Sequence, residues 1–121
     1  MRVLVVDPSP LAQNLYGLLL RNCHTEVTVM TRDALSELES PDEWPALDLI
    51  VISSLLLEGG GAQYRAYLTD LPALAELPKL VIVRPGTNGR RVAWHNLPNA
   101  VELNRPFRPE EFERVVKKIL R

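Results

Sequence analysis

Short runs of aliphatic residues alternate along the chain with longer segments in which apolar residues recur at helical spacing. Strands are predicted over Arg2–Val6, Glu26–Met30 (an alternating edge strand), Leu47–Ile52, Leu80–Val83 and Ala100–Leu103. Helices are predicted over Pro10 to about Asn22, Arg32–Glu39, Gly61 to about Asp70, about Asn88–Asn96, and Pro109–Leu120. This alternation indicates an α/β fold, in which a doubly wound sheet of five parallel strands carries helices on both faces.

Turn and cap residues separate these segments. Ser9 is predicted to cap a helix that begins at Pro10, and Thr31 to cap the helix that follows the edge strand. Ser40–Pro45 is predicted as a loop, and Pro72 is expected to interrupt a connector rich in leucine and alanine. No repeat or linker divides the sequence, so residues 1–121 are expected to form one domain.

Composition narrows the classes of function. Fourteen basic residues balance fifteen acidic ones, whereas nucleic-acid-binding domains usually carry a basic excess. No apolar run approaches the roughly 20 residues that cross a bilayer, and the N-terminus has no signal-peptide pattern. Cys23 is the only cysteine, which excludes an internal disulfide and a cysteine-rich zinc site. A cytoplasmic protein with no nucleic-acid or membrane partner is expected.

Candidate chemistry gathers where the predicted strands end. In a doubly wound sheet, ligands bind at the carboxyl ends of the strands, beside the switch in strand order. Four of these strands end at Asp7-Pro8, Ser53-Ser54, Val83-Arg84 and Asn104-Arg105-Pro106.

Three motifs at these ends resemble those of response-regulator receiver domains from two-component signalling. They are Val5-Val6-Asp7, Asp48-Leu49-Ile50-Val51-Ile52 and Arg105-Pro106-Phe107, and their order and spacing are also similar to the family's. The resemblance covers the whole chain. It implies a single receiver-like domain with the flavodoxin-like strand order 2-1-3-4-5.

The resemblance breaks at the residues that carry receiver chemistry. Of the two adjacent acids that hold Mg²⁺ in receivers, only Asp7 is present, and the second position holds Pro8. The phosphoacceptor aspartate falls on Ser53. The Ser/Thr position that senses the phosphoryl group falls on Val83, and the lysine before a proline falls on Arg105.

These replacements predict that the phosphorylation pocket is degenerate. Mg²⁺ is normally held by one or two carboxylates plus waters, and phosphoryl transfer needs a nucleophilic oxygen next to that cation. A single carboxylate beside an always-charged guanidinium is expected to bind Mg²⁺ weakly. The Ser53 hydroxyl would need a general base within hydrogen-bond reach, and no histidine is predicted at these strand ends. We therefore expect no catalytic residue, no metal and no cofactor, and interpret the chain as a pseudo-receiver and not as an enzyme.

Binding is the function that remains. The resemblance implies a partner or homodimer surface on the helix predicted at residues 88–96, the last strand and the last helix; the corresponding residues are Arg91, Trp94, His95, Glu102 and Lys118. The sequence thus predicts a phosphorylation-independent protein–protein interaction module of a bacterial signalling system.

Two alternatives stay open. The vacated pocket could serve as a sensor for a small anionic ligand, held by Arg84, Arg105 and Ser53. The chain could also be a phospho-receiver that uses a non-standard acceptor.

Two structural expectations concern Arg105. Its bond to Pro106 resembles the family's cis Lys-Pro bond and is expected to be cis. The guanidinium is expected to form an ion pair with Asp7 and to occupy the space of the metal and the phosphoryl group. The alternative for Asp7 is a purely structural role, in which it caps the turn into the first helix.

Overall fold

The computed structural model describes residues 1–23, 26–33, 46–58, 68–69, 72–85 and 97–120. The elements in these ranges are β1 (Arg2–Val6), α1 (Pro10–Cys23), β2 (Thr28–Arg32), β3 (Leu49–Ser53), the 3-10 turn η3 (Ser54–Leu56), α3 (Pro72–Ala75), β4 (Lys79–Val83), β5 (Ala100–Asn104) and α4 (Pro109–Ile119). All five strands are parallel and form one sheet in the order β2-β1-β3-β4-β5, which confirms the predicted topology.

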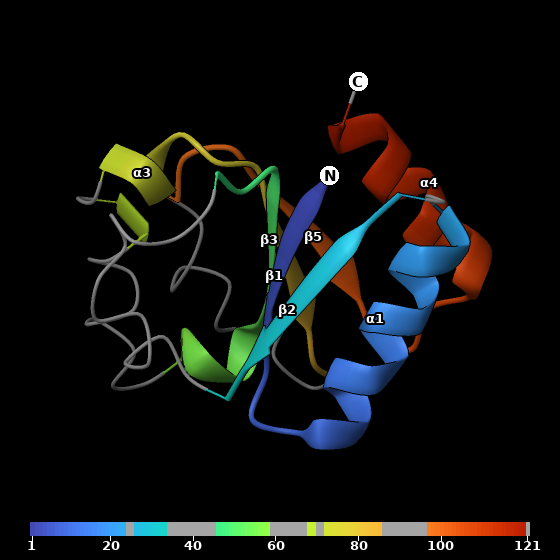
Figure 1. Ribbon diagram of the computed structural model, residues 1–121. Helices are drawn as coiled ribbons and strands as arrows, with labels where there is room; N and C mark the ends of the chain where they lie inside the picture. The colour runs from blue at the N-terminus through green and yellow to red at the C-terminus, as the bar shows by residue number, and fades with distance from the viewer. Residues whose placement is uncertain (24–25, 34–45, 59–67, 70–71, 86–96, 121) are drawn as a thin grey trace.

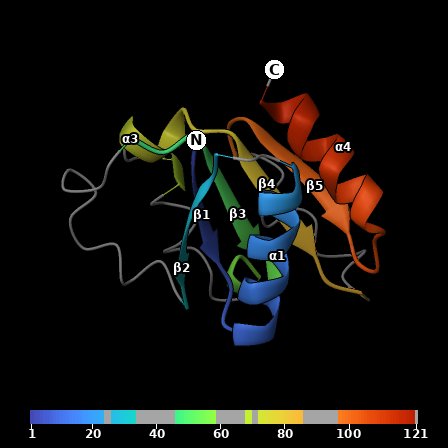
Figure 2. The same ribbon diagram turned by 45° about the vertical axis from the view of Figure 1, so that its right-hand side comes forward.

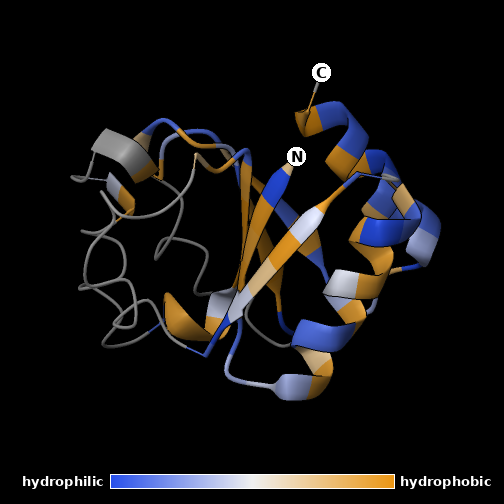
Figure 3. Ribbon diagram, in the orientation of Figure 1, coloured by the Kyte–Doolittle hydropathy of each residue, from blue (hydrophilic) through white to orange (hydrophobic). Residues whose placement is uncertain are grey.

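Helices lie on both faces of this sheet. Figures 1 and 2 show α1 and α4 side by side on one face, with η3 and α3 on the other side. The strands β1, β3 and β4 are buried on both faces, as their continuous apolar sequences predict, and Figure 3 shows the hydrophobic colour concentrated along them. None of the described helices is long and apolar enough to span a bilayer.

Alternating side chains of the central strands feed two cores. Val3 and Val5 point toward α1 and α4, whereas Leu4 and Val6 point to the opposite face. On the first face, three aromatic rings stack with centroids 5.7–6.3 Å apart; they belong to Tyr16, Phe107 and Phe112. This stack joins α1 to α4 and to the loop after β5.

The beginning of α1 follows the predicted capping pattern. The backbone N–H of Ala12 donates to Ser9 Oγ at 3.3 Å, and that of Gln13 donates to the carbonyl of Ser9 at 3.0 Å. Pro10 occupies the first helical position, where no backbone donor is needed.

Several predicted boundaries need correction. Thr31 and Arg32, predicted to start a helix, belong to β2, because they pair with Val5 and Val6 of β1. Ser53 lies inside β3 rather than after it. Pro72 begins α3 instead of interrupting a connector, since a proline fits the first turn of a helix. The helices predicted at 32–39, 61–70 and 88–96 fall mostly or wholly outside the described residues.

A lysine is completely buried at the amino end of β4. The Nζ atom of Lys79 donates to three backbone carbonyls, those of Ala75 at 3.0 Å, Leu77 at 2.8 Å and Pro98 at 2.8 Å. Ala75 ends α3, Leu77 lies between α3 and β4, and Pro98 precedes β5. The lysine therefore connects the end of α3 and the start of β5 to the sheet. Burial lowers the pKa of Lys79 to about 8, which leaves the ammonium charged at neutral pH.

Candidate functional site

The carboxyl ends of the strands bring the predicted pocket residues to one edge of the sheet. This edge lies where β1 leads into α1, with η3 beside it (Figure 1). The backbone N–H of Asp7 donates to the carbonyl of Arg32 at 3.1 Å, and that of Arg105 donates to the carbonyl of Val83 at 2.8 Å, so backbone hydrogen bonding continues one residue beyond β1 and β5.

Asp7 is a buried carboxylate at the end of β1. Its Oδ1 atom accepts a hydrogen bond from the backbone N–H of Ser9 at 2.8 Å, which closes the turn into α1. Burial raises the pKa of the Asp7 carboxyl, and the Ser9 hydrogen bond and the charge of Arg105 oppose that rise in part. Pro8 follows with no polar side chain. Asp7 thus has the capping role that the sequence allowed for it.

The predicted ion pair between Asp7 and Arg105 is wrong. Among the described residues, no nitrogen of Arg105 lies within 4.0 Å of a carboxylate oxygen. The Asp7 carboxylate is turned toward the start of α1, and the guanidinium extends into an open cleft instead. The charge of Arg105 therefore reaches Asp7 only through space. The Arg105-Pro106 bond is cis, as predicted.

A buried hydroxyl lies close to this guanidinium. Burial raises the pKa of the Tyr16 phenol, and the approach of Arg105 opposes that increase. Among the described residues, the Tyr16 oxygen nevertheless has no hydrogen-bond partner of satisfactory geometry. The aromatic stack holds the ring in place, so its packing accounts for its position without any bond at the hydroxyl.

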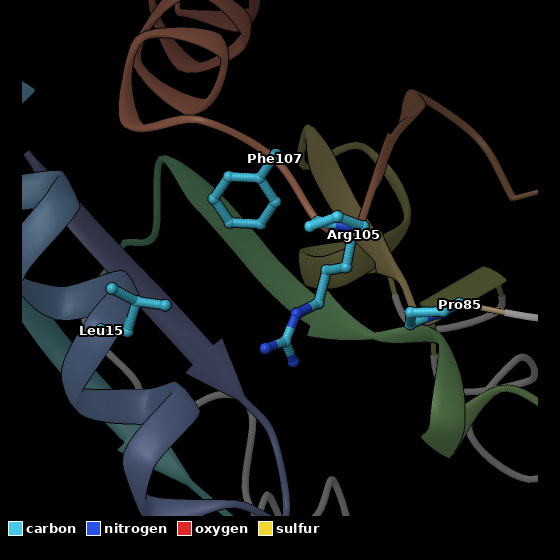
Figure 4. Close-up of a pocket in the computed structure, with 5 residues that line it drawn as sticks. Leu15, Pro85, Arg105 and Phe107 are labelled. Carbon is cyan, nitrogen blue, oxygen red and sulfur yellow. The ribbon is translucent and has the colours of Figure 1, made fainter.

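The cleft beside Arg105 is open and mostly apolar. It has a volume of about 400 Å³ and is lined by Leu15, Pro85, Arg105, Pro106 and Phe107. Figure 4 shows Arg105 pointing away from its loop into this space, with Leu15 and Phe107 facing it.

Both serines at the end of β3 have their hydroxyl oxygens engaged. Ser53 Oγ accepts from the backbone N–H of Leu55 at 3.2 Å and caps η3. Ser54 Oγ accepts from the backbone N–H of Arg84 at 3.1 Å. The two histidines of the chain, His24 and His95, lie outside the described residues. Val83 is buried, and its aliphatic side chain offers no hydroxyl to a phosphoryl group.

An ion pair that the sequence did not suggest joins the ends of β3 and β4. Arg84 Nε lies 2.8 Å from Glu58 Oε2, and Arg84 Nη2 donates to Glu58 Oε1 at 3.3 Å. The two residues come shortly after neighbouring strands, which is the signal that could have found them. Together with the bond from the Arg84 backbone to Ser54, this pair tethers the loop after β4 at two points.

We expect Glu58→Gln to lower the free energy of unfolding by about 1 kcal/mol. The Glu58 side chain is 4% exposed but that of Arg84 is 44% exposed, so water can take over part of the contact. Urea unfolding monitored by circular dichroism measures the change.

The matched control is Glu113→Gln, which removes the acid of the exposed Glu113–Lys117 pair on α4. It is expected to leave the unfolding midpoint unchanged. Equal losses in the two variants would contradict a structural role for the Glu58–Arg84 pair.

The donor set does not fit a Mg²⁺ ion. The ion prefers several oxygen ligands in octahedral geometry, at least one of them usually a carboxylate. Among the described residues of this edge, two carboxylates are buried: Asp7, whose Oδ1 is already hydrogen bonded and has a guanidinium nearby, and Glu58, which is paired with Arg84. Within the described residues, no three acidic, histidine or cysteine side chains cluster as metal ligands.

Part of the predicted interface can be located. Glu102 is half-buried on the edge strand β5, and Lys118 is exposed near the end of α4. Arg91, Trp94 and His95 lie outside the described residues.

Comparison with known proteins identifies the fold. No protein-family model matches the chain, and no curated protein matches it. Among solved structures, a signal receiver domain of a two-component signal transduction histidine kinase from Clostridium thermocellum is 15% identical with a TM-score of 0.84; the alignment covers 99% of this chain and 97% of that one. The chemotaxis response regulator CheY4 of Vibrio cholerae is 16% identical with a TM-score of 0.76, and 98% of each chain is covered.

The same fold also forms part of longer proteins. NtrX from Brucella abortus is 21% identical with a TM-score of 0.76, and the alignment covers 98% of this chain and 26% of NtrX. With these similarities and the observed strand order, the chain has the fold of a response-regulator receiver domain.

Proposed function

We propose that the chain is a pseudo-receiver, a phosphorylation-independent protein–protein interaction module of a bacterial signal-transduction system. The observation that carries the proposal is the donor set at the strand ends. The Asp7 carboxylate, whose Oδ1 atom already accepts a hydrogen bond from Ser9, lies at the same edge as Ser53 and the charged guanidinium of Arg105. This set lacks both the carboxylate acceptor and the acidic pair that receiver phosphorylation needs.

The tether of the loop after β4 supports the same proposal. In many protein switches, the binding or covalent addition of a charged group moves a loop from one arrangement to another. Here Arg84 already bonds to Glu58 through its side chain and to Ser54 through its backbone. The Glu58–Arg84 ion pair thus already holds the loop after β4, as a newly bound charged group would do in such a switch.

The proposed activity is binding without catalysis, in the cytoplasm, with a protein as partner. The partner or homodimer surface proposed from the receiver resemblance includes Glu102 of β5 and Lys118 of α4, with Arg91, Trp94 and His95. An anion sensor is less well supported, since Arg84 contacts Glu58 and Ser53 Oγ caps η3.

Incubation with acetyl phosphate and Mg²⁺ is expected to leave the intact mass of the protein unchanged. The Ser53 hydroxyl oxygen caps η3 and is a weak nucleophile unless a general base activates it, and Asp7 alone is a poor ligand for the cation. Proteins captured on the immobilised chain are expected to be the same with and without acetyl phosphate. Addition of a phosphoryl group at high occupancy would contradict the proposal and favour a receiver with another acceptor.

A further inference from the structure

Arg105 carries an unbalanced positive charge into an apolar cleft. No residue that the structure describes places a carboxylate oxygen within 4.0 Å of its guanidinium, which extends from the loop after β5 into the cleft (Figure 4). The cleft has a volume of about 400 Å³, and its other described lining residues are apolar: Leu15, Pro85, Pro106 and Phe107. A cation among apolar walls suits a ligand with an anionic group and an apolar body.

The buried hydroxyl of Tyr16 needs an acceptor close to the same guanidinium. Tyr16 is 1% exposed, and its phenol oxygen has no hydrogen-bond partner among the described residues. A guanidinium has only donors, so Arg105 cannot accept the phenol proton however closely it approaches. The Asp7 carboxylate acts on the phenol through its charge, and its Oδ1 atom is turned toward Ser9. An anion bound to Arg105 would supply the missing acceptor.

The charges around the cleft favour a monoanion over a dianion. Arg105 is the one cation among the described residues that line the cleft, and Asp7 lies close enough for the two charges to interact. A phosphate dianion would place two negative charges against one guanidinium and near that carboxylate. A carboxylate carries one charge and matches the planar fork of the guanidinium with two parallel hydrogen bonds.

The walls of the cleft favour an aromatic body on that carboxylate. The Phe107 ring lines the cleft and stacks with Tyr16 and Phe112 at centroid distances of 6.3 and 5.7 Å, so it is a wall held in place. A ligand ring against Phe107 would extend this stack and bury apolar area. The volume is near the lower end for small-molecule pockets, which fits a ligand with a single ring.

We propose that this cleft binds a small aromatic monocarboxylate, whose carboxylate pairs with Arg105 and accepts a hydrogen bond from the Tyr16 hydroxyl. The ring of the ligand lies against the apolar walls. This site differs from the anion sensor considered above, because neither Arg84 nor Ser53 lines the cleft. It is also independent of the proposed partner function, since binding of the ligand requires no second protein.

Phenylacetate is the probe that tests the proposal. Titration of the isotope-labelled full chain, followed by amide chemical shifts in NMR spectra, is expected to show saturable shifts at Leu15, Arg105 and Phe107. A ligand of this size is expected to bind with a dissociation constant of about 1 mM. Phenylacetamide has the same shape without the charge and is expected to bind about 10-fold more weakly, as is phenyl phosphate.

Three variants separate ligand binding from folding. Tyr16→Phe removes only the hydroxyl, so it should weaken phenylacetate binding about 10-fold and leave the unfolding temperature unchanged or raised. Arg105→Gln removes the charge and should weaken binding by at least as much. Arg108→Gln is the matched control, because Arg108 is an exposed arginine of the same loop that does not line the cleft. It is expected to leave the dissociation constant unchanged.

Several results would overturn the proposal. One is the absence of shifts at the cleft amides when phenylacetate is well above the expected dissociation constant. Another is equal binding of phenylacetate and phenylacetamide, which would show that the charge of the ligand is not recognised. Equal losses in Arg105→Gln and Arg108→Gln, or unchanged affinity in Tyr16→Phe, would likewise contradict the assigned contacts.

Discussion

Lys79→Met is expected to lower the free energy of unfolding by about 3 kcal/mol at pH 7. Methionine keeps the length of the side chain and removes all three donors. The carbonyls of Ala75, Leu77 and Pro98 are then left in the interior without the ammonium that they share in the wild type. The midpoint of urea unfolding at neutral pH checks the loss.

The same substitution has a pH dependence with a definite sign. Burial lowers the pKa of Lys79 from 10.5 to about 8, so between these values the unfolded chain binds a proton that the folded chain has released. The stability of the wild type therefore rises with pH in this window, by at most about 1.4 kcal/mol per pH unit. The stability difference between wild type and Lys79→Met should widen above pH 8.

The control for both measurements is Lys118→Met, which removes an exposed ammonium on α4. It is expected to change neither the unfolding midpoint nor its pH dependence. A difference between wild type and Lys79→Met that stays constant from neutral to alkaline pH would show that Lys79 titrates normally and is not desolvated.

Pro8→Asp combined with Ser53→Asp is expected to create a Mg²⁺ site at the cost of stability without the ion. The two new carboxylates join Asp7, whose pKa burial already raises, so a loss of about 3 kcal/mol is expected in a chelator. Mg²⁺ at about 100 times its dissociation constant should return about 2.7 kcal/mol. Thermal unfolding with and without the ion measures both changes.

Pro8→Asn combined with Ser53→Asn is the matched control. Its side chains have the shape of those in the Asp double variant, and it has the same backbone donors, but it adds no charge. Its unfolding temperature is expected to be the same with Mg²⁺ and with chelator. A similar response to Mg²⁺ in the Asp and Asn proteins, or none in either, would mean that missing carboxylates are not what separates this pocket from a metal site.

The sheet could be predicted from the sequence because its central strands are buried on both faces. Such strands read as continuous aliphatic runs: the observed limits of β1 and β4 differ from the predicted ones by at most one residue, and β3 begins two residues and ends one residue later than predicted. The limits of the edge strand β5 also agree to within one residue. The edge strand β2 was misplaced by two residues. Its limits depend on pairing with β1, and that long-range contact has no local signature.

Side-chain partners at the site were harder to predict. The turn from Asp7 to Ser9 is local, and its hydrogen bond agrees with the sequence pattern. The Glu58–Arg84 pair joins distant segments, and no periodicity shows where each long side chain turns. A wholly buried lysine is rare, so the three carbonyls around Lys79 could not be expected from composition.

The contact between Ser54 and Arg84 has a consequence for hydrogen exchange. The backbone N–H of Arg84 donates to a side-chain oxygen across two loops, and that of Leu55 donates to Ser53 Oγ within the same edge. Neither amide is protected by the β ladder. Both can exchange with solvent when this edge opens, without unfolding of the strands beneath it. The two amide protons therefore report the local opening free energy of this edge of the sheet, separately from the global stability of the domain.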